Sequence, residues 1–125
     1  MPGGDYSRRR IIYQDCSTTA NFAATDGNLT LITGKTNFTI YVQRIIVVIK
    51  TSAAQTMTFE DTNSSAVYVA KLPASPGVDT VWQFDFGPEG KALTSAKNLV
   101  LTMTAGNAGH YEILAYFKPD AVVTA

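Results

Sequence analysis

One stretch of the sequence, Phe38 to Lys50, constrains the fold more than any other. Its letters, FTIYVQRIIVVIK, are almost all residues that favour β-strands. Apolar and polar residues alternate from Phe38 to Gln43, which is the period of a strand with one buried face. From Ile45 to Ile49 the alternation stops, because aliphatic residues follow one another without a break. A strand that is apolar on both faces needs cover on both, and in a chain this short we expect another subunit to supply the second cover.

The length and charge of the chain limit its class. With 125 residues it has the usual size of a single domain, and at 46% hydrophobic residues it can fill one core. Ten basic residues balance ten acidic ones, so the chain has no overall field that would attract nucleic acid or a membrane surface. We expect neither as a partner.

Short alternating segments separated by turn residues fill most of the sequence. Asp26-Gly27 and Gly87–Gly90 are two of the turn signals. Between turns, VDTVWQFDF directs Val78, Trp82, Phe84 and Phe86 inward. This pattern predicts an all-β fold, a two-sheet antiparallel jelly-roll sandwich of about eight strands, with an immunoglobulin-like sandwich as the second choice. We expect residues 1–7 to form a flexible arm, residues 8–118 the sandwich, and residues 119–125 a tail.

Two residues are the first candidates for chemistry. His110 is the only histidine, it has no flanking carboxylate at ligand spacing, and the sequence offers no partner that would orient it as a general base. Cys16 follows Asp15, whose charge disfavours a reactive thiolate. We interpret His110 as a strand-edge residue and Cys16 as a packing residue, and we predict no catalytic residues, no cofactor and no enzyme activity.

Acidic residues suggest one alternative of another kind. Glu60 and Asp61 close a strand and could join Asn63 in a Ca²⁺ site, because hard cations prefer such oxygen ligands. The simpler interpretation is a solvated strand end, and we predict no metal site.

The only run of like charges is Arg8–Arg10. One interpretation is a tethering arm that meets an acidic surface or another subunit. The other is a charged strand edge that prevents sheet-to-sheet pairing.

Aromatic residues could form a ligand face, because sugars stack on exposed rings. Trp82 shares the inward parity of its strand, which favours a core position over a stacking platform. Tyr41, Tyr68 and Tyr116 alternate with core aliphatics and suit an interface or a ligand face.

Three segments carry a resemblance to a known family: RIIVVIKTSAAQTMTFEDT, VWQFDFGPEGKAL and NLVLTMTAGNAGHYEILAYFK. Together they resemble the small jelly-roll structural proteins of tailed bacteriophages, over about Phe38 to Lys118. Members of that group are similar to capsid decoration (cement) proteins and to head or tail accessory modules, and are frequently trimeric. The resemblance transfers no catalytic residue.

The resemblance and the opening strand together give a functional hypothesis. We expect a non-enzymatic virion structural protein that assembles in the host cytoplasm as a homotrimer, binds the major capsid protein of a phage head, and stabilises the head. The predicted subunit interface is Tyr41, Ile45, Val47 and Ile49, with Ile46 and Val48 in the core, and Arg8, Arg9 and Arg10 form the capsid-contact arm. The alternative is a carbohydrate-binding or receptor-binding sandwich of a phage fibre, phage tail or bacterial surface, with Tyr68, Tyr116 and Trp82 as its ligand face.

Overall fold

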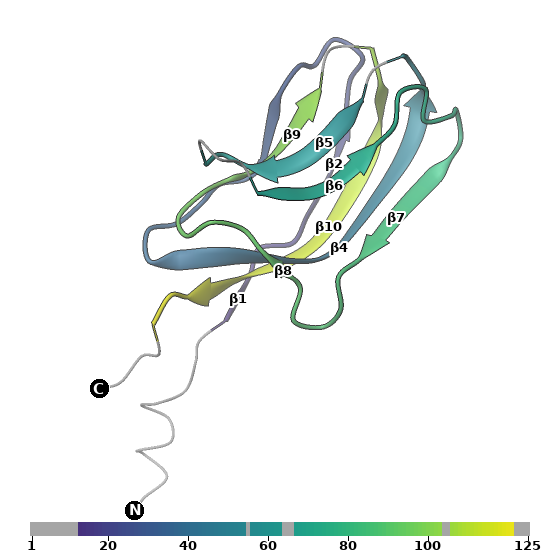
Figure 1. Cartoon of the computed structure of the whole chain (residues 1–125). Coiled ribbons are helices and arrows are strands. Elements are labelled where there is room, and N and C mark those ends of the chain that lie inside the picture. Colours follow the sequence, from purple (N-terminus) through teal and green to yellow (C-terminus); the bar gives the residue numbers. More distant parts are fainter. Residues whose placement is uncertain (1–12, 55, 64–66, 104–105, 122–125) are drawn as a thin grey trace, which may run out of the picture.

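Every regular element in the described part of the chain is a β-strand (Figure 1). The structure is a computed structural model, and it describes residues 13–54, 56–63, 67–103 and 106–121. No helix in these ranges is long and apolar enough to cross a membrane. The strands are β1 (Gln14–Asp15), β2 (Thr18–Phe22), β3 (Leu29–Ile32), β4 (Phe38–Thr51), β5 (Met57–Asp61), β6 (Tyr68–Leu72), β7 (Val81–Asp85), β8 (Lys91–Ala92), β9 (Leu99–Met103) and β10 (Ala108–Pro119).

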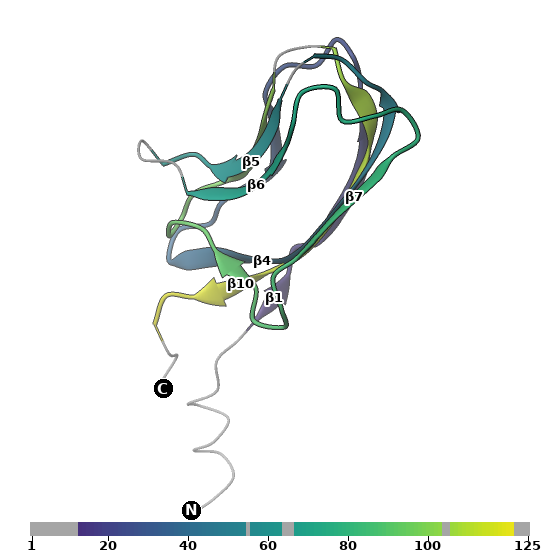
Figure 2. The ribbon, with the colours of Figure 1, turned by 45° about the vertical axis from the view of Figure 1, so that its right-hand side comes forward.

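The strands form two antiparallel sheets that pack face to face (Figure 2). In the larger sheet β10 lies between β4 and the short strands β1 and β2, and β4 pairs on its other side with β7 and β8. The smaller sheet has the order β3-β9-β5-β6. The predicted all-β sandwich is confirmed.

Aliphatic and aromatic side chains from the two inner faces form a single core. The side chains of this core are buried because alternate residues of each strand point between the sheets. The fully buried members include Ile40, Val42, Ile45, Val47, Ile49, Met57, Phe59, Leu72, Leu99 and Leu101.

A β-bulge divides β4 into two halves. Val42 pairs with Ala115 and Arg44 with Leu114, so Gln43 has no partner on β10. One added residue reverses the parity of the strand, because successive side chains point to opposite faces. Even-numbered residues therefore face the core before the bulge, and odd-numbered residues face it afterwards.

This parity overturns the predicted subunit interface. Ile45, Val47 and Ile49 have no exposed surface and belong to the core of the chain's own sandwich. Ile46 and Val48, which we expected in the core, are half-buried on the opposite face of the sheet.

The loop between β7 and β8 is the turn predicted at Gly87–Gly90. Both of these glycines have a φ of 82°, a left-handed conformation that other residues adopt at a cost. A Cβ on Gly90 would also lie only 2.8 Å from the carbonyl oxygen of Val42. The loop therefore passes close to β4, and it carries Pro88 and Glu89 toward the outer face of the larger sheet.

The prediction for Val78 is wrong. Its side chain is 58% exposed, because β7 begins only at Val81 and residue 79 has a positive φ of 58°. Trp82, Phe84 and Phe86 do pack against the core as predicted.

Candidate functional site

The outer face of the larger sheet, which points away from the smaller sheet, carries an apolar strip. We use the name outer apolar strip for Ile46, Val48, Val81 and Leu114. Val48 pairs with Val81 across β4 and β7, and Ile46 and Leu114 line one shallow concavity. Val81 is 59% exposed and Leu114 46% exposed. Exposed apolar residues that adjoin one another on neighbouring strands often mark a surface that binds another protein.

Three tyrosines gather where β1, β4 and β10 lie side by side. Tyr41 and Tyr116 are paired in the sheet, and their rings stack with centroids 5.4 Å apart and planes 10° apart. Tyr13 meets the Tyr116 ring edge to face at 5.2 Å. We call Tyr13, Tyr41 and Tyr116 the tyrosine cluster.

The β7–β8 loop is held against this cluster by two hydrogen bonds. The hydroxyl of Tyr116 donates to the backbone oxygen of Glu89 over 2.6 Å, and Nε2 of Gln43 donates to the backbone oxygen of Pro88 over 2.6 Å. Burial raises the pKa of the Tyr116 phenol, and the neighbouring Tyr13, Tyr41 and Glu89 raise it further.

Three shallow concavities follow one another across the outer face. The first, of about 360 Å³, is lined by Tyr13, Gln43, Pro88, Glu89 and Tyr116. The second, of about 320 Å³, shares Gln43 and Pro88 with the first and adds Arg44, Asp85, Gly87 and Leu114. The third, of about 390 Å³, shares Arg44 and Leu114 with the second and continues along Thr19, Ile46 and Glu112. Together they form one trough, which we call the outer-face trough.

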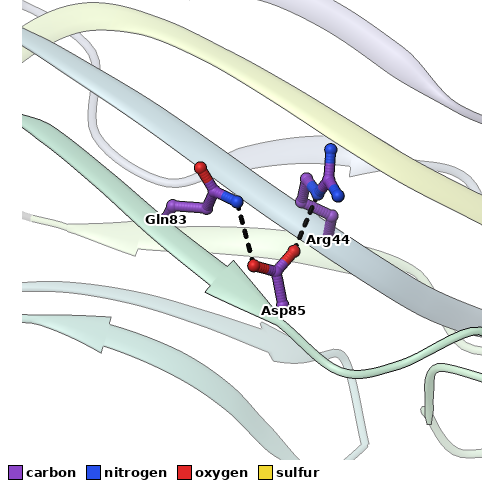
Figure 3. Close-up of polar contacts among 3 residues, drawn as sticks. All are labelled: Arg44, Gln83 and Asp85. Atoms are coloured by element: carbon purple, nitrogen blue, oxygen red, sulfur yellow. Dashed lines mark hydrogen bonds and ion pairs between the residues drawn. The ribbon is translucent and has the colours of Figure 1, made fainter.

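An ion pair lies in the middle of the trough (Figure 3). Nε of Arg44 lies 2.7 Å from Oδ1 of Asp85, and Nε2 of Gln83 donates to Oδ2 of the same carboxylate over 2.9 Å. The hydrogen bond from Arg44, followed by that from Gln83, lowers the pKa of Asp85. The charge of Arg44 is therefore already matched within the sheet.

The aromatic residues predicted as a ligand face do not share one surface. Tyr116 lies on the outer face of the larger sheet, and Tyr68 lies on the smaller sheet with 49% of its surface exposed. Trp82 packs against the core, and its Nε1 donates to the backbone oxygen of Pro76 over 3.1 Å. The core interpretation of Trp82 is confirmed, and these three rings do not form a stacking platform.

The remaining interface and arm predictions have separate outcomes. Tyr41 lies on the outer face, half-buried against Tyr116, where a contact with another molecule stays a prediction. Arg8, Arg9 and Arg10 lie outside the described residues.

The contacts of His110 and Cys16 within the fold are those of structural residues. Nε2 of His110 lies 3.0 Å from Oγ1 of Thr19, and its Nδ1 lies 2.9 Å from Oδ1 of Asn21; both partners lie on β2. Cys16 packs against the core, and burial followed by the charge of Asp15 raises the pKa of its thiol to about 11. The interpretation of Cys16 as a packing residue is confirmed.

Asp61 is a buried anchor, and the prediction of a solvated strand end is wrong for it. Only 2% of its surface is exposed, and its carboxylate accepts backbone N–H groups of Asn63, Val67 and Thr94 over 2.8–3.0 Å. Burial alone would raise the pKa of this carboxyl, but the hydrogen bonds outweigh it and lower the pKa. Glu60 points to the opposite face of β5, and the described residues contain no group of three or more His, Cys, Asp and Glu placed to hold a metal ion.

No protein-family model and no curated protein sequence matches this chain. The outer face of the larger sheet is therefore identified as the candidate site by its geometry alone.

Proposed function

We propose that this chain is a non-enzymatic structural protein of a virion, a capsid decoration protein of a tailed bacteriophage. In this proposal it assembles as a homotrimer, binds the major capsid protein and stabilises the head. The proposal builds on the resemblance of residues 38–118 to small jelly-roll proteins of phage structural gene sets.

The order of the strands supports the jelly-roll part of this proposal. The four longer strands of the larger sheet have the order β2-β10-β4-β7, and the smaller sheet has the order β3-β9-β5-β6. The chain crosses from one sheet to the other at β2–β3, β3–β4, β4–β5, β6–β7, β8–β9 and β9–β10. Two four-stranded sheets connected in this way fit the double Greek key of a jelly roll, which supports this part of the proposal.

The observation that carries the assembly part is the outer apolar strip. The bulge at Gln43 turns Ile46 and Val48 outward, where Val48 pairs with the exposed Val81 and Ile46 lines one concavity with the exposed Leu114. A cyclic trimer can bury such a strip where its three copies approach the threefold axis, with each subunit making a head-to-tail contact with the next. The assembly face is therefore proposed on Ile46 and Val48, in place of the Ile45, Val47 and Ile49 of the sequence-based prediction.

Two matched variants test the assembly. Val81 and Val78 are almost equally exposed, at 59% and 58%, but only Val81 belongs to the strip. We expect the wild-type protein to have three times the 13.5 kDa mass of the chain in light scattering. Val81→Asp should shift the protein to the mass of one chain, because an unpaired charge in an interface is costly, and Val78→Asp should leave the trimer intact. A wild-type protein with the mass of a single chain would contradict the proposal.

A second experiment tests the partner. Purified protein is mixed with undecorated heads of the phage that encodes it, and bound protein is measured after sedimentation. We expect saturable binding and greater resistance of the heads to heat. Replacing Arg8, Arg9 and Arg10 by serine should weaken binding if this segment contacts the capsid. A trimer that does not sediment with the heads would refute the decoration role.

The alternative, a carbohydrate-binding module, has less support. Of its proposed ligand residues, Tyr116 lies on the outer face of the larger sheet, Tyr68 lies on the smaller sheet, and Trp82 packs against the core. One face of the Tyr116 ring is covered by Tyr41, and Tyr13 meets the ring at right angles. A glycan array would test this function directly, with Tyr68→Ala as the variant expected to lose any signal.

A further inference from the structure

The first concavity of the outer-face trough is negatively charged and aromatic. Its lining residues are Tyr13, Gln43, Pro88, Glu89 and Tyr116, and Glu89 is the charged one. Across the described ranges, the carboxylate of Glu89 has neither a hydrogen bond nor an ion pair. Its neighbour Asp85, one concavity further along, is in contrast neutralised by Arg44.

The tyrosine cluster beside this concavity already holds a cation over one of its rings. Nζ of Lys118 lies 5.3 Å from the ring centroid of Tyr41. Each ring carries negative potential over its face, which favours a cation within about 6 Å. Tyr13, which is 53% exposed, lines the same concavity as Glu89 and adds a further aromatic ring to it. The chemistry of the concavity therefore suits a guanidinium or ammonium group.

The chain itself supplies such a group close by. Tyr13, which lines the concavity, is the first described residue, and Arg10 precedes it by three positions. Three residues of extended chain span at most about 11 Å, so the length of the chain allows the side chain of Arg10 to reach a concavity that Tyr13 lines. Planar guanidinium groups pair with carboxylates and also stack on aromatic rings.

We propose that the concavity between Tyr13, Tyr116 and Glu89 binds a guanidinium group of the chain's own Arg8–Arg10 segment when the protein is free in solution. This binding site does not depend on the virion function: it concerns the isolated chain, and it would exist in a protein with any partner. If Arg8–Arg10 also contact a capsid, the segment leaves the concavity on binding.

Limited digestion with trypsin tests the proposal, because trypsin cuts after arginine. The rate at which the intact chain loses its first ten residues is followed by mass spectrometry for the wild-type protein and for Glu89→Gln. We expect the variant to be cut about two- to threefold faster, the factor that one exposed ion pair provides, because the aromatic rings of the concavity remain in the variant. Equal rates would overturn the proposal.

Glu60→Gln is the matched control. Glu60 lies on β5 in the smaller sheet, outside the outer-face trough, and its replacement changes the net charge by the same amount. We expect its cleavage rate to equal that of the wild-type protein, and acceleration as large as in Glu89→Gln would refute a local site. Tyr13→Leu, which removes the ring but keeps an apolar side chain, should speed cleavage as well. All variants are first compared with the wild-type protein in thermal unfolding, so that a change in stability is not mistaken for release of the segment.

Two further measurements test whether the concavity binds the Arg8–Arg10 segment of the same chain or that of a second copy, and whether the binding is electrostatic. Protection that is independent of protein concentration supports binding within one chain, whereas protection that grows with concentration would overturn it in favour of a second copy. High salt should abolish the difference between the wild-type protein and Glu89→Gln, because at 1 M the screening length is about 3 Å. A difference that persists at high salt would contradict an electrostatic site.

Discussion

Ile45 and Ile46 are consecutive residues of β4 that lie on opposite faces of the larger sheet. Ile45 is fully buried between the sheets, whereas Ile46 is half-buried on the outer face. We expect Ile45→Ala to lower the free energy of unfolding by about 3–4 kcal/mol, because it leaves a cavity in the core. Ile46→Ala should cost about 1 kcal/mol or less. Urea denaturation of both variants measures the difference, and equal losses would contradict the position of the bulge.

The buried carboxylate of Asp61 should make the free energy of unfolding depend on pH. Its hydrogen-bonded carboxylate has a pKa below the ordinary value of 3.8, so the folded state gains stability from its ionised form above that value. This contribution should be lost as the pH falls through the lowered pKa of the folded state. Asp61→Asn should cost about 2 kcal/mol at neutral pH. Its deficit relative to the wild-type protein should shrink in acid, as chemical denaturation from pH 7 downward would show; a constant deficit would contradict this role.

Any side chain at position 109, near the start of β10, should clash with the backbone of the neighbouring strand β4. A Cβ at this position would lie 2.0 Å from the carbonyl oxygen of Val48, in the neighbouring strand. Gly109→Ala should therefore destabilise the protein by about 3 kcal/mol or more, because strand backbone must move. Gly27→Ala is the control, since a Cβ there meets nothing within 4 Å. Thermal unfolding of the two variants gives the comparison. A Gly109→Ala variant as stable as the control would contradict the close contact between β10 and β4 at this position.

We expect the thiol of Cys16 to be alkylated slowly in the folded protein. Its thiol has a pKa of about 11 in place of 9.0, so the reactive thiolate at pH 8 is about 100-fold rarer than in an ordinary cysteine. The rate with iodoacetamide should rise with pH up to about 11 and should increase sharply when urea unfolds the protein. Rapid labelling of the folded protein at pH 8 would contradict the burial of this thiol.

The extent of the strands could be predicted from the sequence, but the faces of the longest one could not. The predicted strand Phe38 to Lys50 appears as β4, Phe38–Thr51, because strand propensity and alternation are local properties. The face that Ile45 occupies depends on the bulge at Gln43, which is set by the register against β10. Nothing within β4 reveals that register.

The candidate site was only partly predictable for a similar reason. The alternation of the sequence predicts Tyr41 and Tyr116 outside the core, but Tyr13 joins them only because β1 pairs with the end of β10. Asp61 is the opposite case. It continues the alternation of Met57 and Phe59, so its inward position could have been inferred from the same parity.

The central place of β10 in the larger sheet has a consequence for how the protein folds during synthesis. β10 is the last of the described strands, and it lies between β2 and β4, which are made much earlier. Until residues 108–119 leave the ribosome, β2 and β4 have no common partner, and the aliphatic side chains of β4 lack their neighbours on β10. Pairing of strands so far apart in the chain is slow, because a long loop must close first. We therefore expect the larger sheet to form after translation of β10, with early intermediates that expose aliphatic strands and need protection from aggregation.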